Sequence, residues 1–341
     1  MVKLLPVILV FVGLVVGCGQ DRQQQLTVFT WESYISDEIK SGFEKLSGAR
    51  VVVEIFASNE DLLTKIQLGA SGYDIIMPSD YMVDIMVKEN LLAELDRANI
   101  PNFSNIGSQF KGKYFDPDNR YSVPYTWGTA GIAYDSAVVK ETPESWELLW
   151  DEKYARRISM LDDQRETIGV ALKRLGHSVN TTNVEELNAA KQLLLEQKPL
   201  VKQYKSEAEE ILSSGDVDIA HCWSGDAFRA AEKRATLKYA IPNEGTTQFI
   251  DTICIPKATK NKALAEQFIN YLLQPEINAK ITEFTKYGTC VPDARNHVSP
   301  SLRDHAGIYP AEEVMARFES LIDLGDFTPN YDRIWTEVKA K

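Results

Sequence analysis

Short apolar runs alternate with stretches in which apolar residues recur at helical spacing along residues 26–88. The short runs predict strands, and the recurring spacing predicts helices. Strands are expected at 26–30, 50–55 and 73–77, and helices at 36–46, 58–68 and about 81–88. Because strand and helix alternate, the pattern predicts an α/β fold with a mostly parallel sheet. In such sheets, ligands bind beyond the carboxyl ends of the strands.

The same two patterns recur, less regularly, in the rest of the chain. Residues 121–134 mix strand-forming residues with Gly128 and Gly131, and we expect this segment to cross into a second domain. Further strands are expected at 157–161, 217–222, 237–241 and 248–256, and helices at about 163–175, 183–195, 206–212, 261–273, 275–284, 310–322 and 332–339. Asp251 lies inside an apolar strand, where a charged side chain needs a partner or a cavity.

The stretch Ala220–Asp226 joins a short apolar strand to the beginning of a helix. It places an indole, Trp223, and a carboxylate, Asp226, at the carboxyl end of that strand. An aromatic face attracts a cation and a carboxylate pairs with it, so the stretch suits a cationic organic ligand. A core position for Trp223 and a helix-cap role for Asp226 account for the same residues. The stretch alone leaves both interpretations open.

Composition and charge narrow the functional class. The chain has 341 residues, of which 44% are hydrophobic, so it is long enough for two globular domains. Its formal net charge of −12 argues against a nucleic-acid partner and is compatible with cationic ligands. The sequence contains no nucleophile elbow, no phosphate-binding loop and no His or Cys spacing typical of a metal site. We therefore expect a protein that is not an enzyme and has no cofactor or metal.

The N-terminal segment predicts export rather than folded structure. A short positive stretch precedes the apolar run Leu4–Val16, which is too short for a transmembrane span. The run leads into Gly17-Cys18, which resembles a bacterial lipobox, whose cysteine is acylated. We therefore expect a lipoprotein signal peptide at 1–17, a lipid anchor at Cys18 and a polar tether at 18–25. The protein would be periplasmic and attached to a bacterial membrane through this lipid only.

Three further cysteines, Cys222, Cys254 and Cys290, are flanked by apolar or aromatic residues. An exported protein can form disulfides, but this setting favours free buried thiols.

Several motifs follow one another in order from residue 26 to the C-terminus. They are Trp31-Glu-Ser-Tyr34, Tyr73-Asp-Ile-Ile-Met-Pro-Ser79, Tyr121-Ser-Val-Pro-Tyr-Thr-Trp-Gly128, Asp162-Asp-Gln-Arg-Glu166, Trp223-Ser-Gly-Asp226 and Phe249-Ile-Asp251. The ordered set resembles the spermidine/putrescine-binding receptors of bacterial polyamine ABC importers. The resemblance implies a two-lobed periplasmic-binding-protein fold of type II. Each lobe would be a mixed, mostly parallel sheet flanked by helices, with a ligand cleft between the lobes.

The resemblance also implies how the chain divides and which residues bind. One lobe would contain residues 26–130 and 250–296, and the other residues 131–249 and 297–341. Trp31, Tyr34, Tyr81, Trp223 and Tyr287 match aromatic positions of the polyamine channel, Ser79 matches a polar contact, Asp163 and Glu166 match an acidic end, and Asp251 matches the carboxylate near the opposite part of the ligand. These groups suit a polyamine, because aromatic walls contact its methylenes and carboxylates pair with its ammonium groups.

Three positions depart from the spermidine-type receptors and match the putrescine-type ones: Asp226, Phe249 and Leu321. A carboxylate at Asp226 would pair with the second amine of a short diamine. Glu32 stands where a small hydroxyl residue is usual, and either an amine contact or simple solvation accounts for it. We therefore expect a monomeric receptor that prefers putrescine, takes spermidine as second ligand and delivers it to an ABC permease. A two-lobed receptor for an amino acid, a sugar or ferric ion is the alternative.

Overall fold

The computed structural model describes residues 23–69 and 72–340. The predicted signal peptide, Cys18 and most of the predicted tether lie outside the described residues. The strands are β1 (Gln25–Thr30), β2 (Arg50–Ile55), β3 (Ile75–Ile76), β4 (Ser122–Asp135), β5 (Ile158–Met160), β6 (Val201–Tyr204), β7 (Ile219–Trp223), β8 (Leu237–Ala240), β9 (Gln248–Cys254) and β10 (Gly288–Thr289). The α-helices are α1 (Asp37–Ser47), α2 (Asn59–Gln67), α3 (Asp80–Lys88), α4 (Gln164–Arg174), α5 (Val184–Gln197), α6 (Ala208–Ser213), α7 (Ser224–Lys233), α8 (Lys262–Leu272), α9 (Pro275–Thr285), α10 (Pro300–Arg303), α11 (Glu312–Met315) and α12 (Thr328–Ala340).

The strands form one continuous mixed sheet in the order β2-β1-β3-β9-β4-β7-β5-β6, and β8 and β10 both pair with β4. At one end of the sheet, β1 is parallel to β2 and β3; at the other end, β5 is parallel to β6 and β7. The strands between them, β4 and β9, run antiparallel to their neighbours. The predicted α/β fold with mostly parallel strands at each end of the sheet is therefore confirmed.

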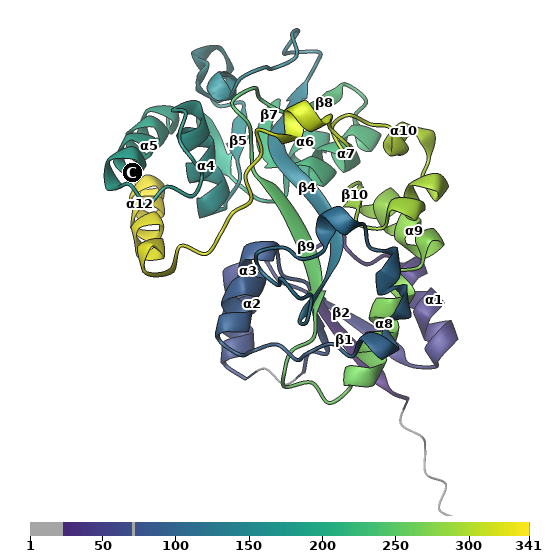
Figure 1. Cartoon of the computed structure of the whole chain (residues 1–341). Helices are drawn as coiled ribbons and strands as arrows, with labels where there is room; N and C mark the ends of the chain where they lie inside the picture. The colour runs from purple at the N-terminus through teal and green to yellow at the C-terminus, as the bar shows by residue number, and fades with distance from the viewer. Residues whose placement is uncertain (1–22, 70–71, 341) are drawn as a thin grey trace, which may run out of the picture.

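The central strand β4 connects the two ends of the sheet. Its 14 residues are all buried, as expected for a strand with neighbours on both edges. Residues 122–129 of β4 pair with β9, and residues 130–135 pair with β7 and β8. Figure 1 shows β4 and β9 running between an upper group that contains α4–α7 and a lower group that contains β1, β2, α2, α3 and α8. Two backbone segments thus join the two groups side by side.

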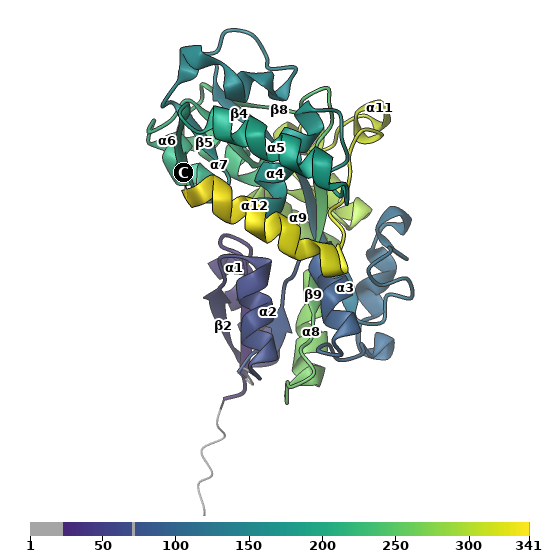
Figure 2. The same ribbon diagram turned by 90° about the vertical axis from the view of Figure 1, so that its left-hand side faces the viewer.

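Local sequence signals explain where the helices begin and end. Ser36 caps α1, and its hydroxyl accepts a hydrogen bond from the Ile39 N–H at 3.3 Å. The same helix ends at Gly48, which has a φ of 74°, a conformation that glycine adopts without strain. At the other end of the chain, α12 lies beside α4 and α5 (Figure 2). Its buried residues there are Tyr331, Ile334 and Val338.

One predicted helix is absent from the structure, and one observed strand was not predicted. The helix expected at 310–322 is wrong, because only α11 is helical there and the following residues run beside the beginning of β9. Glu319 forms a parallel bridge with Thr247, and its N–H and C=O bond to Thr246 and Gln248 at 3.0 and 2.9 Å. The pairing with a neighbouring segment outweighs the local helical pattern. Strand β6 was not predicted, because its sequence is short and polar.

Candidate ligand cleft

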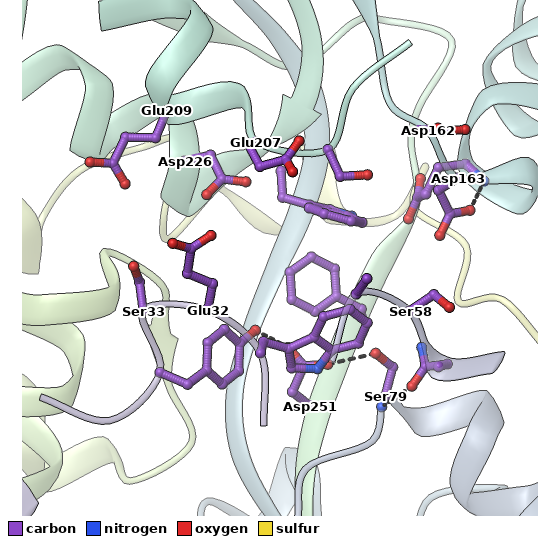
Figure 3. Close-up of a pocket in the computed structure, with 18 of the residues that line it drawn as sticks. Glu32, Ser33, Ser58, Ser79, Asp162, Asp163, Glu207, Glu209, Asp226 and Asp251 are labelled. Carbon is purple, nitrogen blue, oxygen red and sulfur yellow. Dashed lines mark hydrogen bonds between the residues drawn. The ribbon is translucent and has the colours of Figure 1, made fainter. Parts of the chain in front are cut away.

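The sequence-predicted site residues come together around one cavity of about 1250 Å³. Trp31, Glu32, Tyr34, Ser79, Tyr81, Asp163, Glu166, Trp223, Asp226, Phe249, Asp251 and Tyr287 all line it, as does Leu321. Figure 3 shows Asp162 and Asp163 at one end, Glu32, Glu209 and Asp226 at the other, and Glu207 and Asp251 between them. The cavity is therefore elongated, with acidic side chains at both ends and in the middle.

The fold places these side chains by one rule: most of them follow the carboxyl end of a parallel strand. Trp31 follows β1, Ser79 follows β3, Asp163 follows β5, and Trp223 ends β7. The chain then turns into a helix or a tight loop. After β1 the turn uses Ser33, whose φ of 59° is unusual for a residue other than glycine. This turn lets Trp31 and Tyr34 line the same cavity.

Aromatic rings form the middle of the cavity. The rings of Trp31 and Trp223 lie with centroids 6.3 Å apart and their planes tilted by 58°. Tyr287 makes edge-type contacts with Tyr34 and Phe249, with centroids 5.9 and 5.5 Å apart. These rings present apolar faces for an alkyl chain and negative faces for a cation.

Asp251 lies below these rings, in the middle of β9. Its carboxylate accepts hydrogen bonds from Ser79 Oγ, at 2.7 Å, and from the Tyr34 hydroxyl. The side chain is 2% exposed. Burial raises the pKa of Asp251 to about 6, and the two hydrogen bonds counteract part of that effect. The charged residue in an apolar strand thus faces a cavity, as its position in the sequence predicted.

The acidic end contains Asp163 and Glu166. Asp163 Oδ1 accepts hydrogen bonds from the N–H groups of Arg165 and Glu166, both at 2.9 Å, and so caps α4. Glu166 accepts a hydrogen bond from Thr247 Oγ1 at 2.6 Å. Burial is the main cause that raises the pKa of both carboxyl groups, and nearby negative charge adds to it. Asp163 is therefore a helix cap and a wall residue at once.

A fourth carboxyl group, Asp80, is not among the site residues that the sequence predicted. It is 1% exposed and lines the cavity, and its Oδ2 has no hydrogen-bond partner among the described residues. Its other oxygen accepts from the Tyr81 N–H at 2.9 Å. Burial raises the pKa of Asp80 well above its ordinary value, and the charge of Asp251 adds to the shift. Sequence reasoning missed this residue because the position also fits the first turn of a helix.

These four carboxyl groups share one property. None of Asp80, Asp163, Glu166 and Asp251 forms an ion pair with a lysine or arginine in the part of the chain that the structure describes. Arg165 is near, but its guanidinium donates to Ile322 O and Asn180 Oδ1, at 3.1 and 2.8 Å. Carboxylates taken out of water without a counter-ion are costly to ionise, which accounts for the raised pKa values of these four groups.

Asp226 differs, because its carboxylate binds Arg229 on the next turn of α7. Arg229 also donates to Glu209 Oε2 at 2.7 Å. Sequence reasoning missed both partners. The pairing of Asp226 with Arg229 could have been predicted, because the two residues are three positions apart on a predicted helix. Glu209 comes from α6, and nothing local indicates that it lies there.

Two predicted residues have less direct positions. Glu32 is exposed at one side of the cavity. Tyr81 is buried, and its hydroxyl donates to Glu60 Oε1 at 3.1 Å and accepts from Asn59 Nδ2 at 3.2 Å. Its ring faces the cavity while its polar end is already satisfied by these neighbours.

Comparison with known families now identifies the class of protein. Residues 38–308 match the family model of bacterial extracellular solute-binding proteins. The chain belongs to this family. Among its relatives, the putrescine-binding periplasmic protein SpuD of Pseudomonas aeruginosa is 33% identical, over 97% of this chain and 96% of its own length. The spermidine/putrescine-binding periplasmic protein of Salmonella typhimurium is also 33% identical, over 92% of this chain and 91% of its own length.

Solved structures of solute-binding proteins share the fold. A putative spermidine/putrescine ABC transporter protein of Listeria monocytogenes superposes with a TM-score of 0.89 at 33% identity, covering 93% of this chain and 99% of that one. A lipoprotein of Treponema pallidum superposes with a TM-score of 0.84 at 31% identity, covering 93% of this chain and all of that one. This solute-binding protein therefore has the predicted periplasmic-binding-protein fold, and it is a receptor rather than an enzyme.

Other features of this solute-binding protein bear on its chemistry. Cys222, Cys254 and Cys290 are free and buried, as predicted. The described residues contain no cluster of three or more His, Cys, Asp or Glu side chains that could hold a metal ion. Within the described ranges, no helix is both long and apolar enough to span a membrane.

Proposed function

We propose that this solute-binding protein is the polyamine receptor of an ABC importer, with putrescine as preferred ligand and spermidine as second ligand. One observation carries the proposal: Asp80, Asp163, Glu166 and Asp251 line the cavity, and none of them forms an ion pair with another described residue. Aromatic rings line the same cavity. A flexible alkyl chain with ammonium groups supplies the missing charges and covers the aromatic faces. The printed names of several relatives include putrescine or spermidine, which supports the same ligand class.

The shape of the cavity suggests how such a ligand binds. One ammonium group would pair with Asp163 and Glu166 at the acidic end. The methylenes would lie between Trp31 and Trp223, and a second ammonium group would lie near Asp251. Under this proposal the ligand contacts expected from the sequence line the path of the ligand, and Asp80 adds a further carboxyl group to the same cavity.

The proposal includes the division into lobes and the cellular setting. The lobes would be residues 26–130 with 250–296 and residues 131–249 with 297–341, and they would close by hinge motion in β4 and β9. The receptor would act as a monomer outside the cytoplasmic membrane, attached through a lipid at Cys18. It would release its ligand to a permease of the same importer.

A thermal-shift panel tests the ligand class. The purified protein is heated with putrescine, spermidine, a set of amino acids, a set of sugars and ferric ion. We expect stabilisation by putrescine, less by spermidine and none by the other compounds, because a ligand that binds only the folded state raises its stability. Stabilisation by a sugar, an amino acid or iron in place of both polyamines would refute the proposal. Mass spectrometry of ligand released from the purified protein identifies the natural guest.

A further inference from the structure

The Asp226 end of the cavity contains cations of its own, Arg229 and Lys233, of which Lys233 pairs with Glu209 Oε1 at 2.6 Å and Arg229 contacts Asp226 directly. Arg229 lies on α7, and its side chain is 12% exposed. Its Nη2 donates to Asp226, its Nε donates to Glu209 Oε2 at 2.7 Å, and its Nη1 donates to the carbonyl oxygen of Thr285 at 2.6 Å. Every nitrogen of the guanidinium therefore has an acceptor, and the acceptors come from α6, α7 and the last residue of α9. These contacts fix the guanidinium in place.

The guanidinium of Arg229 stays protonated. Burial works against it, yet Asp226, Tyr287 and Glu209 together raise the pKa of Arg229 above its ordinary value. The ring of Tyr287, a wall residue, lies 6.0 Å from the guanidinium carbon. A permanent positive charge thus stands at one end of the ligand path, in contact with the two carboxylates that would otherwise attract an ammonium group.

The two ends of the cavity are therefore unlike. At one end and in the middle of the cavity, the carboxylates of Asp163, Glu166 and Asp251 have no ion pair and can pair with an ammonium group. At the other end, the carboxylate of Asp226 is already paired with the guanidinium of Arg229. Glu32 and Glu207 also lie around Asp226, but Arg229 is the group in direct contact with it (Figure 3). A ligand that extends only from the acidic end to Asp251 avoids the guanidinium, whereas a longer one approaches it.

We infer that Arg229 is a specificity-determining residue that takes the place of the outermost ammonium group of a longer polyamine. The inference rests on the proposed function and deepens it. A diamine leaves Arg229 and Asp226 paired. A triamine brings an additional positive charge toward a guanidinium that cannot move away. Discrimination then comes from repulsion of the longer ligand rather than from an extra attraction for the shorter one.

Calorimetric titration of Arg229 variants with putrescine and spermidine tests this inference. In Arg229→Met, we expect the ratio of spermidine affinity to putrescine affinity to rise at least about tenfold, because like charges in a binding site strongly disfavour a ligand. Arg229→Lys keeps the charge, so its ratio should stay close to that of the wild type. Arg229→Gln keeps a hydrogen-bond donor without the charge, and it replaces Arg229→Met if that variant does not fold.

A matched control separates electrostatics from loss of structure. Arg234 follows the same helix and binds the buried carboxylate of Asp135, but it does not line the cavity. Arg234→Met should destabilise the fold and leave the affinity ratio as in the wild type. An unchanged ratio in the folded Arg229 variant without the charge overturns the inference and leaves the proposed function intact. A wild-type protein that binds neither polyamine overturns the proposed function and this inference together.

Discussion

Trp31 and Trp223 stand opposite each other across the cavity, with ring centroids 6.3 Å apart, although they follow strands at different ends of the sheet. Because one ring ends β7 and the other follows β1, any ligand between them contacts both groups of elements. In the proposed closed state, these rings would press on the alkyl chain from two sides.

Replacing Trp223 should therefore weaken polyamine binding. We expect Trp223→Ala to raise the Kd for putrescine about 10- to 100-fold, because an aromatic wall contributes about 1–3 kcal/mol through apolar contact and attraction of the cation. Trp223→Phe should raise the Kd for putrescine less, because it keeps an aromatic ring. Isothermal titration calorimetry measures both. Trp335→Ala, in α12 outside the cavity, is the control and should keep the wild-type Kd. Equal affinity of Trp223→Ala and wild type would exclude Trp223 from the binding surface.

Removing the charge of Asp251 should have a larger effect. Asp251→Asn keeps the size of the side chain but removes the negative charge from the middle of the cavity, and it turns one of the two oxygens that accept from Ser79 and Tyr34 into an amide donor. We expect the Kd for putrescine to rise about 30-fold or more, because loss of one partner of a buried charge pair costs about 2–5 kcal/mol. Asp116→Asn is the matched control. It neutralises another buried carboxylate that accepts backbone hydrogen bonds, and it should lower stability without changing the Kd.

Binding should depend on pH in a defined direction. Burial raises the pKa of Asp251 to about 6, so the group becomes neutral as the pH falls through that value. The pKa values of Asp163 and Glu166 are raised too. An ammonium group is attracted only to the ionised forms, so affinity should be high near pH 8 and fall steadily below about pH 6. Titrations from pH 5 to pH 8 check this, and an affinity that rises toward acid would contradict it.

The ligand-free protein should show the opposite trend. A carboxyl group whose pKa is higher in the folded state than in the unfolded chain binds its proton more tightly when folded. For Asp251 the stabilising contribution is present below the ordinary value of about 4 and is lost as the pH rises through about 6. The gain in stability from pH 7 to pH 5 should therefore be smaller in Asp251→Asn than in the wild type. Chemical denaturation at the two pH values compares them.

Gly128 allows two aromatic side chains to approach β4 closely. A Cβ atom at this position would lie 2.7 Å from Phe249 Cζ and 2.8 Å from Tyr287 Cδ1. Gly128→Ala should push both rings into the cavity and raise the Kd about tenfold, with a loss of stability of about 1–3 kcal/mol from overpacking. Gly72→Ala is the control, because nothing lies within 4 Å of its Cβ position. Binding by Gly128→Ala at wild-type strength would show that the two rings do not shape the site.

Asp226 provides a sharp contrast between two readings of one residue. If Asp226 simply bound the second amine of putrescine, its removal would weaken putrescine more than spermidine. In the structure, however, Asp226 is bound to Arg229. Asp226→Asn therefore removes negative charge beside the guanidinium and leaves its positive charge less neutralised. We therefore expect spermidine to lose more affinity than putrescine. Titrations with both ligands decide between the two outcomes.

This contrast shows what the sequence can and cannot predict. Trp31, Ser79, Asp163 and Trp223 were predictable, because an apolar strand followed by a turn fixes where the strand ends and which side chains follow it. The state of Asp226 was not, because it depends on Arg229 and on Glu209, which comes from another helix. Sequence patterns place residues at the edge of a sheet, but they do not show which neighbours neutralise a charge there.

The same limit applied to the elements of the fold. Strands with strong apolar patterns, such as β2 and β9, were predicted within one or two residues of their observed ends. The segment after α11 was misassigned, because its conformation follows from bonds of Glu319 to Thr246 and Gln248 rather than from its own periodicity. Long-range pairing overrides local propensity where a chain runs along an available strand.

The carboxyl groups without ion pairs imply that ligand capture is an ion exchange. Burial raises the pKa of Asp251 to about 6, so near that pH a proton that this group holds in the empty cavity would leave when an organic dication binds under the proposed function. The observed heat of binding will then include the ionisation heat of whichever buffer accepts that proton. Under the proposed function, the receptor would release protons as it binds its ligand, and a lower external pH would favour release of the ligand.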